Sequence, residues 1–468
     1  MMKYTNSQQK AFIKFNDFIN SQQHIFIING YAGTGKTTLI KGFLEYLGKM
    51  NKVCTLLAST GRAAKILSRI TKRSAVTIHS QIYKFDDLNE NIGLVATTIT
   101  NDGKDPGWLF PKFELCKSDN ESDIFIIDES SMISDEEDKD PEIAIFGSGR
   151  LLSDLLDFAP NAKFIFVGDE CQLPPVKGAF SPALDKKYFE KEFSLPAIKS
   201  TLTEIVRQKE TNDLLLATQE IRKLISQKNN KTWTKFPLKN YQNIRIIDNE
   251  DNFVKNYVND IKSNKYNNAT LICRSNKTVS RMNSLIREKL GRTPNKLQKG
   301  ELLLVTQNNL LSGLLNGDLV KVINVGEQVK NAGLTFREVE VEELNSKRRF
   351  SQYLIEEILF QNVPRLTKQQ QRTLYIDYYH RMKRKQIFQS SKEFKEGLFK
   401  DVYLNALRAV FGYAITCHKA QGGEWNNVYL NIPKKLAHET KPEDFQWLYT
   451  ALTRAKEYVY LINGFWLK

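Results

Sequence analysis

The sequence predicts an α/β protein built from two domains of similar design, with smaller insertions in each. Near the start of the chain, a glycine-rich loop at residues 30–37 lies between an apolar run and a helical pattern. Strand–loop–helix patterns then recur in both halves, although the second half has no such loop. The chain has 468 residues, which is room for about two to four domains of ordinary size. The two halves are therefore expected to share a design, with the phosphate-binding loop in the first alone.

The loop Gly30-Tyr-Ala-Gly-Thr-Gly-Lys-Thr37 matches the pattern of a phosphate-binding P-loop. Its glycines let backbone N–H groups turn inward, and the N-terminus of the following helix favours an anion. Lys36 is long enough to reach the β- and γ-phosphates of a nucleotide, and the Thr37 hydroxyl suits Mg²⁺. The loop by itself indicates a nucleoside triphosphatase and leaves open what the hydrolysis drives.

Two further strands end in side chains that suit the same chemistry. The apolar run 124–127 is followed by Asp128 and Glu129. Asp128 is expected to hold the water shell of Mg²⁺, and Glu129 to orient and polarise the attacking water. The next apolar strand, at 163–168, leads to Gln172, which is placed to sense the γ-phosphate. Acids at a strand end are common, so this assignment depends on the P-loop.

Composition favours a polyanionic partner and a reducing compartment. The chain holds 68 Lys and Arg against 53 Asp and Glu, a formal charge of +15. This excess fits nucleic acid, although a basic and well-solvated surface explains it equally well. The five cysteines are scattered without metal-ligand spacing, and neither a signal-peptide core nor a membrane-spanning apolar run is present. We expect a cytosolic protein that is not bound to a membrane.

Polar clusters at other strand and helix ends depend on their context. The segment 59–65 places hydroxyls, a glycine and two cations after a strand, as a contact to nucleic-acid phosphates requires. The amide of Gln8, at the start of a helix, suits the edge of adenine, but a plain surface residue explains it too. His79 alone would usually be structural, and Arg454 alone would usually be a surface cation.

Two segments interrupt the strand–helix alternation. Residues 81–120 carry turn signals and aromatic residues, which predicts a small hairpin insertion whose aromatics wedge a duplex or form their own core. Residues 298–345 contain short strands around the turn Asn316-Gly-Asp318, which predicts a small β module. A basic helical excursion at 345–400 follows it.

The order of these motifs resembles that of superfamily 1 helicases, specifically the 5′-to-3′ branch of RecD-like and Dda-like proteins. The likeness covers nearly the whole chain, and the Gln172-Leu-Pro-Pro form of one motif points to the RecD-like branch. The matching segments are 4–8, 30–37, 60–65, 77–79, 128–131, 168–176 and 416–424, with Arg207 and Arg454 at the positions of the family's arginine fingers.

The resemblance implies an ATP-dependent DNA helicase that uses Mg²⁺ and has two RecA-like domains with parallel sheets. It assigns catalysis to Lys36, Asp128, Glu129, Gln172, Arg207 and Arg454. It assigns nucleotide contacts to Gln8, Gly33, Thr34, Gly35, Lys36, Thr37, Thr38, Gln421 and Glu424, and Mg²⁺ to Thr37 and Asp128. It assigns contacts to single-stranded DNA to Thr60, Arg62, His79, Thr416 and His418. The two arginines are expected to reach the nucleotide from the second domain.

The expected boundaries follow from the same likeness. The first RecA-like domain comprises 1–80 and 121–190, the second comprises 191–297 and 411–468, a pin-type insertion comprises 81–120, and an SH3-like module with its helical excursion comprises 298–410. The excursion is expected to brace the pin, for which Trp108 and Phe110 are the candidate aromatics. The expected partners are single-stranded DNA and duplex junctions, bound by a monomer in the cytoplasm of a bacterium or a phage-infected cell. A translocase that does not unwind, and a binding protein switched by ATP, stay open as alternatives.

Overall fold

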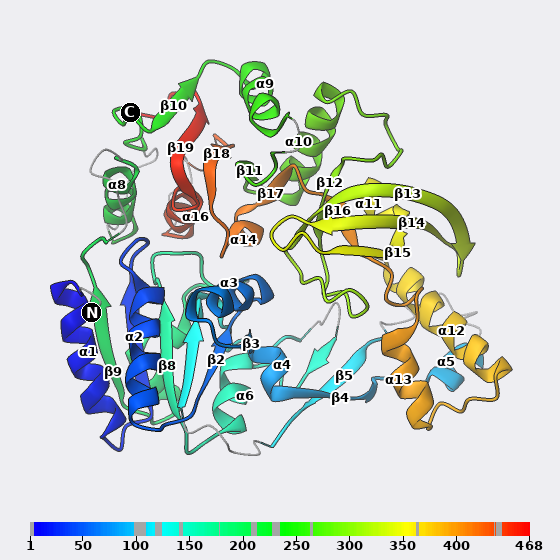
Figure 1. Ribbon diagram of the computed structural model, residues 1–468, viewed down its shortest axis with the longest axis horizontal. Helices are drawn as coiled ribbons and strands as arrows, with labels where there is room; N and C mark the ends of the chain where they lie inside the picture. The colour runs from blue at the N-terminus through cyan, green and yellow to red at the C-terminus, as the bar shows by residue number, and fades with distance from the viewer. Residues whose placement is uncertain are drawn as a thin grey trace.

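The computed structural model describes residues 4–97, 109–117, 124–139, 144–176, 178–206, 213–226, 235–262, 265–361, 365–434, 436 and 442–468. Figure 1 shows two sheet-and-helix domains, one above the other, with an antiparallel β module and a group of helices beside them. All five cysteines are free thiols. Within the described ranges, no helix combines the length and the apolar character that crossing a membrane requires.

The first domain is built on a six-stranded sheet in which every pairing is parallel. In spatial order its strands are β3 (Ala75–Thr77), β2 (Cys54–Ala58), β6 (Ile124–Asp128), β8 (Lys163–Gly168), β1 (Ile25–Gly30) and β9 (Ala197–Leu202). Its helices include α1 (Asn6–Ile19), α2 (Lys36–Lys49), α3 (Gly61–Thr71), α4 (Ile78–Ile82), α6 (Leu151–Phe158) and α7 (Lys186–Glu192).

Helices cover both faces of this sheet, which explains why its central strands are continuous apolar runs. Phe26 and Ile28 of β1 join the core beneath α1, α2 and α3. Ile25 and Ile27 of the same strand join the core on the opposite face, with α4, α6 and α7. Strand alternation thus divides one apolar run between two cores.

One expected boundary is wrong. We expected residues 191–297 to open the second domain, but β9 pairs with β1 along its whole length, from Ile25 opposite Ala197 to Gly30 opposite Leu202. The first domain therefore extends at least to Leu202. A short edge strand carries no sequence signal for its partner, because the same apolar residues fit the edge of either sheet.

The second domain has a five-stranded parallel sheet. In spatial order its strands are β10 (Ile244–Ile247), β19 (Ala455–Ile462), β18 (Trp425–Leu430), β11 (Ala269–Cys273) and β17 (Ala414–Thr416). Its helices include α8 (Leu214–Ser226), α9 (Glu250–Ile261), α10 (Asn276–Lys289), α14 (Cys417–Ala420) and α16 (Pro442–Leu452).

The predicted β module is a separate antiparallel sheet of five strands. In spatial order these are β15 (Arg349–Ile355), β14 (Leu334–Glu343), β13 (Leu319–Asn331), β12 (Leu302–Val305) and β16 (Ala409–Phe411). The excursion between β15 and β16 contains α11 (Glu356–Phe360), α12 (Lys368–Arg384) and α13 (Lys392–Lys400). Because β16 pairs with β12, the module's sheet gains its last strand just before the chain returns to the second domain's sheet at β17.

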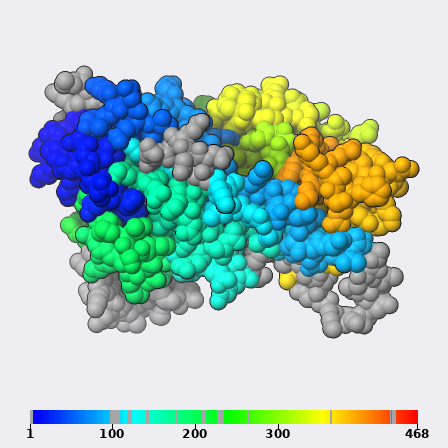
Figure 2. Space-filling model, turned by 90° about the horizontal axis from the view of Figure 1, so that it is seen from below, coloured from blue at the N-terminus to red at the C-terminus, as the bar shows by residue number. Residues whose placement is uncertain are grey.

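The insertion after residue 80 contains a hairpin of β4 (Tyr83–Leu88) and β5 (Pro111–Leu115), followed in space by β7 (Ile145–Phe146). We placed the end of the insertion at 120, yet β7 also joins its sheet. The hairpin and α5 (Ile92–Thr97) share one hydrophobic core with α12 and α13, and Figure 2 shows these segments against each other.

The contact expected between the excursion and the insertion is therefore present. The rings of Phe85 and Phe399 lie 4.7 Å apart, and Lys395 pairs with Asp87 at 3.0 Å. Phe110 is buried at 3% exposure, which does not suit a residue that meets a duplex. Trp108 lies outside the described residues.

Candidate nucleotide site and nucleic-acid interface

The P-loop joins β1 to α2 at the edge of the sheet where the parallel strands end. Gly33 and Gly35 have φ angles of 80° and 76°, a region that side chains disfavour. A Cβ at Gly35 would lie 2.6 Å from Gln8 Nε2, so α1 packs directly on the loop. Lys36 Nζ donates to Gly30 O at 2.7 Å, which holds the ammonium within the loop. The loop thus has the backbone conformation and the cation that phosphate binding requires.

Gln8 and its neighbours fasten this loop. The Gln8 side chain is buried, accepts a hydrogen bond from Thr5 N–H at 3.0 Å and donates to Thr34 O at 2.9 Å. Thr34 is buried as well and donates to Tyr31 O at 2.7 Å. In this conformation Gln8 therefore links α1 to the P-loop, and its contact with adenine stays a prediction. Thr37 and Thr38 open α2, the first half-buried and the second exposed.

Asp128 and Glu129 lie at the end of β6, as predicted. Asp128 is buried and accepts from Glu129 N–H at 2.9 Å. Burial, with the Glu129 carboxylate beside it, raises the pKa of Asp128 above its usual value. Glu129 has a left-handed backbone, with φ 52°, and its Oε2 is buried without a donor among the described residues. An acidic residue with a positive φ and a buried oxygen that lacks a donor is typical of a functional site.

The side-chain oxygens of Asp128 and Thr37 fit Mg²⁺ bound with a nucleotide. Mg²⁺ in such sites is held by one or two protein oxygens, by phosphates and by water, and Asp128 and Thr37 supply a carboxylate and a hydroxyl. Gln172 is also buried, and its Oε1 likewise has no donor among the described residues. The buried oxygens of Glu129 and Gln172 suit a bound water or a phosphate that supplies the missing partners.

Helix α16 of the second domain docks onto this site. The Tyr449 hydroxyl donates to Asp169 Oδ2 at 2.8 Å and accepts from the P-loop amide of Ala32 at 3.1 Å. Thr450 Oγ1 accepts from Leu173 N–H at 2.9 Å, and Gln446 donates to the Glu170 carbonyl at 3.1 Å. The three α16 residues share one face of the helix. None of the three has a role predicted from the sequence, because nothing in it showed which residues of this helix face the first domain.

Tyr449→Phe is expected to weaken this connection measurably. The change leaves the buried Asp169 carboxylate without its hydroxyl donor, at a cost of about 1–3 kcal/mol. We therefore expect a lower urea midpoint for unfolding. Tyr458→Phe, on β19, is the matched control because its hydroxyl makes no comparable bond to the described residues of the first domain. Equal midpoints for the two variants would contradict the role of Tyr449.

Of the two expected arginine fingers, the structure describes only Arg454. Arg454 is buried, and its Nε and Nη2 donate to Thr450 O and Thr453 Oγ1, both at 3.0 Å. These bonds hold it within the second domain, so its contact with the nucleotide stays a prediction. Arg207 lies outside the described residues. Val206, just before it, donates its N–H to Gly33 O at 2.9 Å, which ties this segment to the first domain instead of the second.

The segment after α14 also contacts the first domain. Gln421 is buried, and both of its amide atoms are without partners among the described residues. Gly422 has φ 71°, and a Cβ there would lie 3.8 Å from Ala63 N at the start of α3. Glu424 pairs with Lys456 at 3.8 Å. Gly422 thus lies against the start of α3 in the first domain, and the nucleotide contact expected of Gln421 stays a prediction.

Comparisons with known proteins relate this chain to helicases. A model described as an AAA domain matches residues 3–231, and one described as a UvrD-like helicase C-terminal domain matches residues 411–462. Together these two models support a superfamily 1 helicase. Relatives include the ATP-dependent DNA helicase Dda of Enterobacteria phage T4, 26% identical over 70% of this chain and 66% of Dda. The ATP-dependent RecD2 DNA helicase of Deinococcus radiodurans is 27% identical over 41% of this chain and 21% of RecD2.

The chain spans less than two thirds of the length of several curated relatives, among them an uncharacterized protein of Methanocaldococcus jannaschii, of which it covers 37% at 28% identity. Solved structures share the fold. A Pif1 helicase structure at forked double-stranded DNA superposes with a TM-score of 0.52 at 19% identity, covering 98% of this chain and 92% of that one. Pif1 from Bacteroides, in complex with ADP-AlF3 and single-stranded DNA, gives 0.50 at 18%, covering 99% and 93%. The two parallel sheets are thus the RecA-like domains of this helicase family.

The threonines expected to contact nucleic acid cap helices at strand ends. Thr60 follows β2 and accepts from Ala63 N–H at 3.2 Å. Thr416 ends β17 and accepts from Lys419 N–H at 3.4 Å. One such threonine thus belongs to each RecA-like domain, at the strand-end edge of its sheet. His418, in α14, is half-buried, and burial lowers the pKa of its ring.

Arg62 lies between the RecA-like domains. Its guanidinium is 4.9 Å from the centre of the Trp425 ring of the second domain. Burial lowers the pKa of Arg62 to about 10, and its Nε and Nη1 have no acceptor among the described residues. In this conformation Arg62 is an interdomain residue, and its contact with a nucleic-acid strand stays a prediction.

His79 is packed among aromatic rings, with Phe146 at 4.9 Å and Tyr83 at 5.7 Å between ring centres. Burial lowers the pKa of His79 from 6.5 to about 4. The folded protein therefore keeps the ring neutral where the unfolded chain protonates it. This placement agrees with the structural role that a lone histidine usually has, and a strand contact by His79 stays a prediction.

His79→Phe is expected to reduce the acid sensitivity of folding. The stability contributed by neutral His79 is fully present above pH 6.5 and is lost as the pH falls towards its folded pKa of about 4. The loss is at most ~1.4 kcal/mol per pH unit. Urea midpoints measured across this range should fall less steeply in the variant, whose ring keeps the contacts with Phe146 and Tyr83. Parallel pH profiles would contradict the buried, neutral state.

The β module contacts both RecA-like domains near Thr60 and Thr416. Lys65 of α3 pairs with Asp318 at 2.6 Å and with Glu343 at 2.9 Å, and both carboxylates are buried in the module. A Cβ at Gly61 would lie 2.4 Å from the Leu315 side chain, and Lys419 of α14 donates to Asn316. The turn that ends at Asp318 therefore lies against the first turns of both α3 and α14.

Proposed function

We propose that this chain is a DNA helicase that hydrolyses Mg·ATP between its RecA-like domains and moves 5′ to 3′ along single-stranded DNA. The observation that carries the proposal is the docking of α16 on the P-loop and on the loop 169–173. A nucleotide in the P-loop changes the surface on which α16 rests, so nucleotide state and domain spacing are linked.

The residues of the first domain divide the chemistry among them. Lys36 would neutralise the β- and γ-phosphates, while Thr37 and Asp128 would hold Mg²⁺, which supplies charge stabilisation when bound. Glu129 would take a proton from the attacking water, using the oxygen that has no other described partner. Gln172 would contact the γ-phosphate. Arg454 and Arg207 would complete the charge compensation, which is worth ~10³–10⁵ in rate for an arginine finger.

Translocation would follow from alternating grip. Thr60 and Thr416 belong to different RecA-like domains, so a strand held by both shifts relative to one of them whenever the cleft closes. Separating a DNA duplex opposes this movement by only ~1.4 kcal/mol per base-pair step. The names of Dda and RecD2, and of the Pif1 structures with single-stranded or forked DNA, support DNA as the substrate.

Unwinding of short duplexes with a single-stranded tail on only one end tests the proposal. With Mg²⁺ and ATP, we expect strand separation of the 5′-tailed duplex and none of the 3′-tailed duplex. Separation of the 3′-tailed duplex alone would show the direction to be wrong. ATP turnover and movement on single strands without separation would favour a translocase, and turnover that single-stranded DNA does not raise would contradict the motor function.

A further inference from the structure

Arg222, on α8 of the second RecA-like domain, rests on the P-loop of the first. The central carbon of its guanidinium lies 3.6 Å from the centre of the Tyr31 ring, and Tyr31 is the residue after Gly30 in the loop. Both side chains are half-buried. A cation over the face of an aromatic ring is attracted by the ring's quadrupole, most strongly where water is excluded. This cation–π contact thus joins the two domains at the nucleotide site.

We propose that Arg222 is a positioning residue for ATP turnover, which acts on Lys36 through Tyr31 and so transmits the spacing of the two domains to the P-loop. The inference rests on the proposed function, because it names a further residue that regulates the same ATP site. It concerns a different helix from α16, and none of the motifs found in the sequence includes Arg222.

The backbone of Tyr31 holds the phosphate-binding lysine. The Tyr31 carbonyl accepts from Lys36 Nζ at 3.3 Å, and also from the backbone N–H of Thr34 at 3.2 Å and its hydroxyl at 2.7 Å. Lys36 Nζ donates to Gly30 O as well, at 2.7 Å. Both acceptors of the ammonium therefore lie at Tyr31 or directly before it. A shift of Tyr31 changes where Lys36 is held, and with it how readily the ammonium meets a phosphate.

The second domain packs around this part of the P-loop. Tyr31 and Ala32 both pack against the hydrophobic core of that domain, which includes Ala217 and Ile221 of α8. Arg222 follows Ile221 directly, so the packing of α8 determines where its guanidinium lies. A movement of the second domain therefore moves the cation relative to the loop, and the Tyr31 ring is the part of the loop that it touches.

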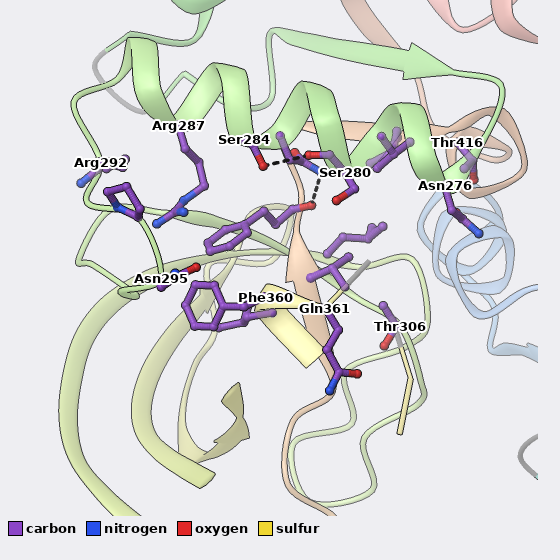
Figure 3. A pocket seen from close by; sticks show the side chains of 18 of the residues that line it. Asn276, Ser280, Ser284, Arg287, Arg292, Asn295, Thr306, Phe360, Gln361 and Thr416 are labelled. Carbon is purple, nitrogen blue, oxygen red and sulfur yellow. Dashed lines mark hydrogen bonds between the residues drawn. The ribbon is translucent and has the colours of Figure 1, made fainter. Parts of the chain in front are cut away.

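Arg222 differs from the structural arginine Arg287, which lines the pocket that Figure 3 shows. The Arg287 guanidinium lies 4.0 Å from the centre of the Phe411 ring, but it also pairs with Glu301 at 2.9 Å. Within the described ranges, Arg222 has the Tyr31 ring and no hydrogen-bond acceptor or carboxylate partner. A guanidinium held by a ring alone can leave it without breaking an ion pair. This suits a contact that forms and parts as the domains move.

Turnover of ATP with and without single-stranded DNA tests the inference, because the DNA acts on both domains in the proposed motor. Arg222→Ala removes the cation from Tyr31, and we expect the ratio of the two rates to fall at least about fivefold, as for loss of a desolvated cation–π contact. Partial unfolding lowers both rates alike and leaves their ratio unchanged. Lys223→Ala, which removes the exposed cation next to Arg222, should keep the ratio within about twofold of the wild type.

Variants of Tyr31 test the same contact from the P-loop. Tyr31→Leu removes the ring and should lower the ratio of the two rates as Arg222→Ala does. Tyr31→Phe keeps a ring for the cation and should retain most of the ratio. In the double variant Arg222→Ala/Tyr31→Leu the two losses should not multiply, because both changes remove one shared contact.

Three results would overturn the inference while the proposed function stands. These are a wild-type ratio in Arg222→Ala, equal losses in Tyr31→Phe and Tyr31→Leu, and losses that multiply in the double variant. If Arg222→Ala does not fold, the comparison of Tyr31→Leu with Tyr31→Phe decides. If single-stranded DNA does not raise the turnover of the wild type, the proposed motor function itself is wrong.

Discussion

Lys36→Ala is expected to abolish ATP turnover. Lys36 is the cation within the P-loop, with Nζ 2.7 Å from the Gly30 carbonyl. From there the side chain needs only a rotation to meet a phosphate bound at the N-terminus of α2. Loss of one charge-stabilising donor in a preorganised site costs at least about 10²-fold in turnover. Phosphate release in saturating ATP and single-stranded DNA measures the effect.

The matched control for this variant is Lys49→Ala, at the exposed end of the same helix. It removes the same charge from α2 and should leave turnover unchanged. Lys36→Ala should still unfold like the wild type, because its side chain is not part of the core. Turnover in Lys36→Ala close to that of Lys49→Ala would show that the loop does not hold the reacting nucleotide.

Glu129→Gln is expected to bind ATP and to hydrolyse it very slowly. The Glu129 Oε2 atom is buried with no donor among the described residues, which leaves it available to an attacking water. An amide of the same shape keeps the packing but takes up no proton, and loss of a general base costs about 10²–10⁴ in rate. The φ of 52° at Glu129 lies in the left-handed region, and such strain is common at functional sites.

Two measurements on this variant separate binding from chemistry. A titration with nucleotide should give an affinity near that of the wild type, while phosphate release should fall by the factor above. Glu136→Gln, in the exposed loop that follows, is the control and should behave as the wild type in both. If Glu129→Gln fails to bind nucleotide, the residue shapes the pocket; if it turns over normally, another group activates the water.

Local structure was predicted well. The P-loop, the acids after β6 and the strands that lead to them form short continuous patterns. An apolar run followed by glycines or carboxylates can take few other conformations. The same holds for the hairpin insertion and the β module, whose turn and strand signals are adjacent in the chain. The helix caps of Thr60 and Thr416 were not predicted, and their contacts with nucleic acid stay predictions.

Contacts between segments that are distant in the chain were predicted poorly. Strand β9 was assigned to the wrong domain, since only its pairing with β1 decides its place. The contact of Arg62 with Trp425, which is far away in the sequence, was not predicted, while its contact with a nucleic-acid strand stays a prediction. Tyr449 had no assigned role, because its contacts with Asp169 and Ala32 join segments that the chain order leaves apart. Such contacts carry no sequence pattern of their own.

The sequence by itself determined the P-loop, the strands that lead to Lys36, Asp128 and Glu129, and the likeness to superfamily 1 helicases. Short-range geometry explains this, because steric limits on glycine loops and buried strands act within a few residues of the chain. Only the tertiary structure decided how the two RecA-like domains meet, through α16, Arg62 and the turn that ends at Asp318. Those contacts depend on the packing of whole domains, which many residues determine together and no single segment records.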